Sequence, residues 1–93
     1  MKNIEIFVMQ GCPYCKNAEK ALAELVKEHP EYGQTAVEWI DENRHPERTE
    51  GHDYYYVPSI FCEGKKLYEA HPGDEYAHIR EKVREALIFA IKD

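Results

Sequence analysis

Hydrophobic and polar positions along the chain follow two periods, which predict strands and helices in alternation. Segment 3–9 has β-branched residues at alternating positions and apolar side chains on both sides beyond Glu5, as in a strand covered on each face. From Pro13 to His29 apolar residues recur every three or four positions, which predicts an amphipathic helix. Segment 35–41 has high β propensity and predicts a second strand. Because a strand, a helix and a strand follow one another, the two strands should pair in parallel through a right-handed crossover.

Beyond residue 41 the pattern predicts a hairpin and leaves one segment open. The polar segment 41–52 can hold either a short helix at about 46–50 or a loop. Segment 54–62 predicts a strand interrupted by Pro58, and a turn at its end leads back into a strand at 65–69. A proline cannot donate to a strand ladder, so we expect Pro58 at the start of a strand or at an edge.

The last predicted element is a helix that begins after Asp74 and extends to Ile91. Asp74 is the expected N-cap, because its side chain can accept hydrogen bonds from the first free amides of the helix. One apolar stripe follows the helical period: Ile79, Val83, Ala86, Leu87, Ala90 and Ile91. The order of elements is therefore β-α-β-α-β-β-α if the short helix forms.

Composition and charge exclude several classes of protein. The 93 residues are enough for one domain with one core, so we expect a single domain over 1–93. A formal net charge of -6, with 18 acidic against 12 basic residues, disfavours nucleic acid and anionic lipid as partners. The longest apolar run, 86–91, is far shorter than the roughly 18 residues of a membrane-spanning helix. Residues 1–3 lead straight into the first strand pattern, so we expect no signal peptide. We expect a monomer.

Three cysteines are too few for the disulfide framework of a small secreted domain. They indicate a cytoplasmic protein, in which closely spaced thiols are more often catalytic or metal-binding than structural. Cys12 and Cys15 lie where the first strand pattern ends and the helical pattern begins. Two residues three apart in a first helical turn share one face, so their sulfurs can form a small-ring disulfide.

The start of the helix should give the two thiols different roles. Pro13 suits the first helical position, which leaves Cys12 at the N-cap, facing unpaired backbone amides. Those amides and the helix dipole favour an anion, so we expect Cys12 to be the nucleophilic thiolate. Lys16, one turn further on, brings a positive charge towards the same sulfur and would tune its ionisation. Cys15 is the expected resolving thiol, which would attack the mixed disulfide formed at Cys12.

Two other interpretations of the cysteine pair remain open. The thiols could belong to a metal-binding or iron–sulfur cluster-binding module, although one chain offers two thiolates where zinc usually takes four ligands. They could also pack in a loop without any chemistry. The five histidines show no paired spacing that would complete a metal site.

The Cys-Pro-Tyr-Cys motif at 12–15, together with Val57-Pro58 before the third strand, resembles the glutaredoxins of the thioredoxin-fold superfamily. The resemblance implies an α/β fold with a four-stranded mixed sheet and helices on both faces. It also implies an enzyme, a thiol-disulfide oxidoreductase that reduces protein or small-molecule disulfides by a dithiol mechanism. In such an enzyme Pro58 would be cis, the Val57 backbone would pair with an extended substrate, and Tyr14 would line the same groove.

Two departures from the glutaredoxins concern the binding of glutathione. Members of that family usually carry a lysine three residues before the first cysteine and a Gly-Gly pair after the fourth strand. Met9 and Tyr68-Glu69 stand in these places, so the positive charge and the small residues are missing, and Glu69 would repel a carboxylate. We therefore expect no cofactor, a disulfide-containing protein as substrate, and a thiol reductase rather than glutathione as the better electron donor. The loop 71–74 could be a displaced glycine loop.

Three other groups of residues have ordinary structural explanations. Cys62 shares a strand face with Ile60 and is expected in the core. His71 lies in a loop that the resemblance places near the dithiol, and we expect its side chain to be solvated. The tyrosines at 54–56 are expected to pack on both faces of a strand rather than to form an exposed aromatic edge.

Overall fold

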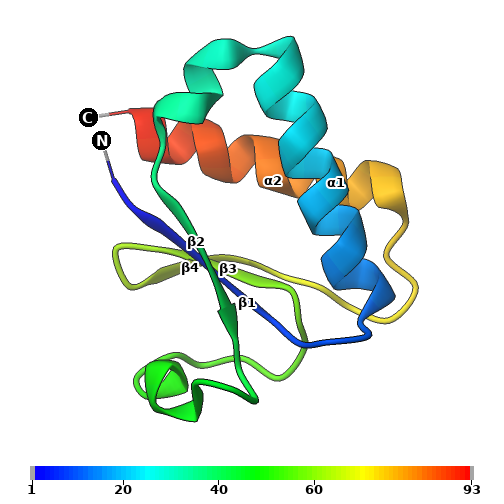
Figure 1. The fold of residues 1–93 in the computed structure, drawn as a ribbon, viewed down its shortest axis with the longest axis vertical. Coiled ribbons are helices and arrows are strands. Elements are labelled where there is room, and N and C mark those ends of the chain that lie inside the picture. Colours follow the sequence, from blue (N-terminus) through cyan, green and yellow to red (C-terminus); the bar gives the residue numbers. More distant parts are fainter. Residues whose placement is uncertain (1, 93) are drawn as a thin grey trace.

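The computed structural model describes residues 2–92 and contains a four-stranded mixed sheet with the strand order β2-β1-β3-β4 (Figure 1). β1 pairs in parallel with β2 and antiparallel with β3, and β3 pairs antiparallel with β4. The strands are β1 (Ile4–Val8), β2 (Val37–Asp41), β3 (Ser59–Cys62) and β4 (Lys65–Glu69). The predicted α/β fold with a parallel crossover and a hairpin is therefore confirmed.

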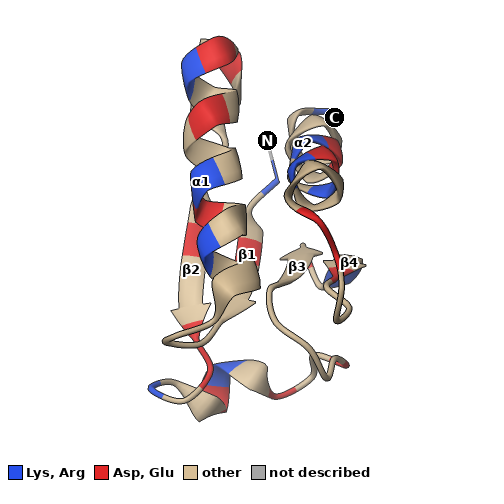
Figure 2. Cartoon of the chain, turned by 90° about the vertical axis from the view of Figure 1, so that its right-hand side faces the viewer, with Lys and Arg blue, Asp and Glu red and all other residues tan. Residues whose placement is uncertain are grey.

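Two α-helices, α1 (Pro13–Glu28) and α2 (Tyr76–Ile91), lie side by side and cover one face of the sheet (Figures 1 and 2). Ile4 and Ile6 of β1 point into this layer and are each 2% exposed. The helices supply most of the other buried side chains there: Ala18, Ala21, Leu25, Ile79, Val83, Ala86, Leu87 and Ala90. Arg80 joins the outer sides of the helices through Glu24 and Glu28, at 3.5 and 2.7 Å.

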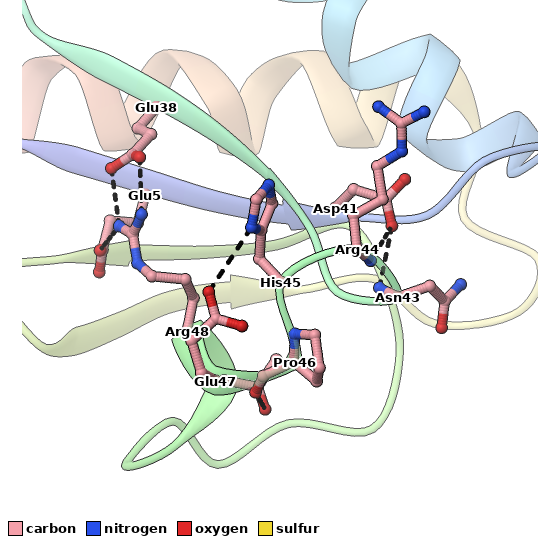
Figure 3. Close-up of polar contacts among 10 residues, drawn as sticks. Glu5, Glu38, Asp41, Asn43, Arg44, His45, Pro46, Glu47 and Arg48 are labelled. Carbon is pink, nitrogen blue, oxygen red and sulfur yellow. Dashed lines mark hydrogen bonds and ion pairs between the residues drawn. The ribbon is translucent and has the colours of Figure 1, made fainter.

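The opposite face of the sheet is covered by the segment between β2 and β3, which contains the 3-10 helix η2 (Pro46–Thr49). Figure 3 shows Arg48 of η2 reaching back to the sheet, where it donates hydrogen bonds to Glu38 and Glu5 at 2.7 and 3.0 Å. Beside it, His52 lies against the ring of Phe7 with centroids 4.8 Å apart. The short helix expected at 46–50 thus exists as a four-residue 3-10 turn on this face, whereas both α-helices lie on the other face.

The predicted starts of β3 and α2 are wrong, and in each case the reason is a hydrogen-bonded carboxylate side chain. The strand predicted over 54–62 begins only at Ser59, because the backbone amides of Tyr55 and Tyr56 bond to the Glu69 carboxylate instead of a neighbouring strand. Asp74 does not cap α2, because its carboxylate accepts hydrogen bonds from the Tyr68 hydroxyl and the His71 amide. The N-cap of α2 is Glu75, whose side chain makes no capping hydrogen bond.

A second 3-10 helix, η1 (Pro30–Gln34), connects α1 to β2. It lies between the first predicted helix and the second predicted strand, and its Tyr32 packs into the helical layer. Within residues 2–92, no helix combines the length and the apolar composition that crossing a membrane requires.

Candidate active site

Cys12 occupies the N-cap of α1, directly after the loop that leaves β1. The loop turns at Gly11, whose φ of 79° lies in the left-handed region that residues with a side chain rarely adopt. Pro13 is the first residue of the helix, and the Cys15 amide donates a hydrogen bond of 3.1 Å to the Cys12 sulfur. The cap arrangement therefore directs a backbone N–H of the first turn at the sulfur that sequence analysis proposes as the nucleophile.

Cys12 is more enclosed than its proposed role suggested, with 5% of its surface exposed. Its thiol donates a hydrogen bond of 3.6 Å to the backbone carbonyl of Val57. The Val57–Pro58 peptide bond is cis, as the sequence predicts. The structure thus brings the dithiol motif and the Val-Pro motif together.

Cys15 differs from Cys12 in its surroundings. It is 2% exposed on the inner side of the first turn, next to Phe7 and Phe61 of the sheet. Burial, followed by the hydrogen bond between its thiol and Cys12, raises the pKa of the Cys15 thiol far above its usual value. In the dithiol form of the protein, Cys15 is therefore a protonated thiol at neutral pH. All three cysteines are free thiols in this structure.

Tyr14 connects the motif to the loop before α2. Its hydroxyl accepts a hydrogen bond of 2.8 Å from the backbone amide of Gly73, and its half-buried ring packs against both core layers. Gly73 has a φ of 96°, again in the left-handed region. The loop 71–74 therefore lies beside the cysteines, where the resemblance to glutaredoxins places it. Lys16 lies one turn along α1 with an exposed side chain.

Glu69, at the end of β4, is bound inside the protein rather than facing the site as a free charge. One of its oxygens, Oε2, accepts hydrogen bonds from the amides of Tyr55 and Tyr56, at 2.7 and 2.8 Å. The other, Oε1, accepts one of 2.8 Å from the Lys66 ammonium. Desolvation alone would raise the pKa of Glu69, but Lys66 and the two amides together lower it to about 2. The expectation that Glu69 acts by repelling a ligand carboxylate therefore needs correction, because its charge is already compensated.

An exposed aromatic edge borders the site, contrary to the expectation that all three tyrosines pack. Tyr54 does pack: its ring stacks on Phe7 at 5.1 Å. Tyr55 is 91% exposed and Tyr56 is 48% exposed, since their backbone is held by Glu69 instead of a strand. We call the contact of Glu69 with the Tyr55 and Tyr56 amides the clamp. The sequence does not predict it, because no local pattern links Glu69 to amides 13 and 14 residues away.

Cys62 and His71 lie where the sequence predicts. Cys62 is 1% exposed within the helical layer, and burial raises the pKa of its thiol. His71 is exposed, with its ring 6.1 Å from that of Tyr56. Among residues 2–92, no group of three or more His, Cys, Asp or Glu side chains gathers as ligands for a metal ion. Cys12 and Cys15 could hold a metal only with ligands supplied from elsewhere.

Comparison with known proteins gives one family match. A family model described as a thioredoxin domain matches residues 2–71, which include the four strands, both cysteines of the motif and Pro58. No curated protein matches the sequence significantly.

Proposed function

Since this chain belongs to the thioredoxin domain family, we propose that it is an enzyme, a thiol-disulfide oxidoreductase that uses Cys12 and Cys15 to reduce disulfides. The observation that carries this proposal is the contrast between the two sulfurs. The Cys12 sulfur accepts a hydrogen bond from a backbone amide at the helix N-terminus, whereas burial holds the neighbouring Cys15 thiol in its protonated form. A dithiol mechanism needs this division, with one thiolate to attack and one thiol held in reserve.

The first step is attack by the Cys12 thiolate on one sulfur of a substrate disulfide. A bond forms between Cys12 and that sulfur, the substrate S–S bond breaks, and the departing sulfur leaves as a thiolate that takes a proton from solvent. As the negative charge leaves Cys12, its repulsion of a thiolate at Cys15 disappears, which removes one of the causes that raise the Cys15 pKa.

The second step closes the cycle within the first helical turn. Cys15 loses its proton to solvent and attacks the Cys12 sulfur of the mixed disulfide. The Cys12–Cys15 disulfide forms, and the second substrate sulfur leaves as a thiolate that is then protonated. The substrate has gained two electrons and the protein has lost two, so an external thiol reductant must restore the dithiol.

The backbone next to Cys12 supports a protein disulfide as the substrate. Val57 places its carbonyl 3.6 Å from the Cys12 sulfur, and we propose that its main chain pairs with an extended segment of the substrate. Tyr14, Val57 and Pro58 would then line the substrate groove. Met9, three residues before Cys12 in the chain, is an apolar residue that is 41% exposed.

We propose that a thiol reductase protein is a better electron donor than glutathione. Glutathione is an anionic tripeptide, and the place of the usual lysine is taken here by Met9. The Tyr55 and Tyr56 amides, which could bind a carboxylate, are already bonded to Glu69.

The proposed function is tested by reduction of insulin disulfides in the presence of dithiothreitol, followed by turbidity. We expect Cys12→Ser to abolish the acceleration over dithiothreitol alone and Cys15→Ser to reduce it strongly. Cys62→Ser is the matched control and should retain activity, because Cys62 lies in the core away from Val57. A Cys12→Ser protein as active as the wild type would refute the proposal.

A further inference from the structure

Two consecutive backbone amides converge on one carboxylate oxygen beside the proposed active site. The amides of Tyr55 and Tyr56 lie 2.7 and 2.8 Å from Oε2 of Glu69. Successive N–H groups that point to one place form a concavity that binds anions. In this protein the anion is the chain's own side chain, contributed by the end of β4.

The second oxygen of Glu69 also accepts a hydrogen bond, so the contact differs from an ordinary surface ion pair. Lys66 donates to Oε1 of Glu69 at 2.8 Å and to the backbone carbonyl of Asp53 at 2.9 Å. Glu69 is 13% exposed, and a carboxylate so enclosed is favourable only when its oxygens are hydrogen-bonded. By contrast, Lys82 and Glu85 have the same spacing along the chain but lie 3.4 Å apart, with Glu85 52% exposed.

The clamped segment leads directly to Cys12. Residues 54–57 belong to no strand, so neighbouring strands do not fix their backbone. Glu69 holds the amide of Tyr56, and the Ser59 hydroxyl donates to the Tyr56 carbonyl at 2.5 Å. The next residue is Val57, whose carbonyl accepts the hydrogen bond from the Cys12 thiol. Glu69 is thus connected to Cys12 through two residues of backbone.

We propose that Glu69, held by Lys66, is a positioning residue for disulfide exchange at Cys12, because its carboxylate fixes the 55–57 backbone that receives the substrate. This inference rests on the proposed function. Glu69 does not touch the reacting sulfurs, so it acts on the binding of a protein substrate through the Val57 main chain. A small disulfide that makes no main-chain pairing is outside its influence.

The test compares Glu69→Ala and Glu69→Gln with Glu85→Gln, the matched control from the other Lys–Glu pair. Steady-state constants are measured for insulin and for a small aromatic disulfide, 5,5′-dithiobis(2-nitrobenzoic acid), on variants shown to be folded by circular dichroism. For Glu69→Ala we expect KM for insulin to rise by about tenfold or more, the equivalent of one charged hydrogen bond. Glu69→Gln keeps an acceptor oxygen and should show a smaller rise. The constants for the small disulfide should change by less than about twofold, and Glu85→Gln should match the wild type.

Several outcomes would overturn the inference. If folded Glu69→Ala keeps a kcat/KM for insulin within about twofold of the wild type, Glu69 serves stability alone. If both substrates lose activity equally, the variant distorts the dithiol itself and positioning is the wrong explanation. If Glu69→Ala does not fold, Glu69→Gln decides between these outcomes. A wild-type protein without any disulfide reductase activity would instead refute the proposed function, and the role of Glu69 with it.

Discussion

At the residue scale, the two cysteines of the motif are almost equally enclosed but chemically unequal. Cys12 is 5% exposed and Cys15 2%, so accessibility alone does not separate them. The difference lies in their surroundings: the Cys15 amide donates a hydrogen bond to the Cys12 sulfur, whereas burial beside apolar rings raises the pKa of the Cys15 thiol. This burial disfavours the ionised form of Cys15.

This inequality predicts the order of alkylation. At neutral pH, iodoacetamide should modify Cys12 at least about ten times faster than Cys15 or Cys62, because burial raises the pKa of both other thiols and each unit lowers the thiolate fraction tenfold. Peptide mapping by mass spectrometry after timed quenching measures the three rates. In denaturant, the three rates should become similar. Faster labelling of Cys15 in the folded protein would reverse the assigned roles.

Glu69 predicts a specific dependence of stability on pH. Its pKa falls from 4.5 to about 2 on folding, so the ionised carboxylate stabilises the protein above about pH 4.5, and this contribution is lost as the pH falls towards 2. We expect Glu69→Gln to lower the free energy of unfolding by about 1–3 kcal/mol at pH 7. The difference from the wild type should shrink steadily between pH 5 and pH 2, a range in which urea denaturation can be followed. A difference independent of pH would show that the charge of Glu69 is not what matters.

At the scale of elements, sequence patterns predicted the helices and strands but not the side-chain contacts that determine where two of them begin. β1, α1, β2, the hairpin and α2 follow from apolar periodicity, which local sequence carries directly. The late start of β3 depends on Glu69, and the uncapped start of α2 depends on the use of Asp74 by Tyr68. Such side-chain contacts arise only when distant segments meet. The placement of Cys12 at the N-cap was predictable, but its enclosure by Val57 was not.

The contact between Tyr14 and the loop before α2 predicts a measurable coupling of two elements. Tyr14→Phe removes the acceptor for the Gly73 amide and should lower the free energy of unfolding by about 0.5–1.5 kcal/mol. Tyr55→Phe is the control, since Tyr55 is 91% exposed, and it should change stability by less than about 0.5 kcal/mol. Both variants can be compared by urea denaturation at pH 7. Equal stability of the two variants would mean that the Tyr14 hydroxyl contributes nothing to the position of the loop.

At the scale of the whole molecule, net charge and exposed apolar side chains support the proposed protein partner over a small anion. The chain carries a formal net charge of -6, and among residues 2–92 the exposed large hydrophobic side chains are Met9, three residues before Cys12, and Tyr55 and Tyr56, just before Val57. The cationic side chain of Lys66, beside Glu69, is already hydrogen-bonded to the Glu69 carboxylate. These features support the proposal that a substrate or reductant with apolar side chains next to its disulfide is preferred over free glutathione.

Restoring the missing charge tests this preference. Met9→Lys should raise the rate of reduction of the oxidised protein by glutathione by about tenfold, because a charge-assisted hydrogen bond to a carboxylate contributes about 1.5–3 kcal/mol. Met9→Leu, which preserves size and apolar character, should leave the rate unchanged. The rates are measured in a coupled assay with glutathione reductase and compared with those from a thioredoxin reductase system. If the wild type is already reduced as fast by glutathione as by the protein system, the preference for a protein reductant is wrong.

The central claim, that Cys12 attacks and Cys15 resolves, is tested most directly by trapping the mixed disulfide. Cys15→Ser protein is incubated with insulin, quenched with acid and analysed by mass spectrometry under non-reducing conditions. We expect a covalent adduct through Cys12, which dithiothreitol releases, whereas Cys12→Ser should give none and the wild type should accumulate a Cys12–Cys15 disulfide instead. An adduct at Cys62, or no adduct with Cys15→Ser while the wild type reduces insulin, would contradict it.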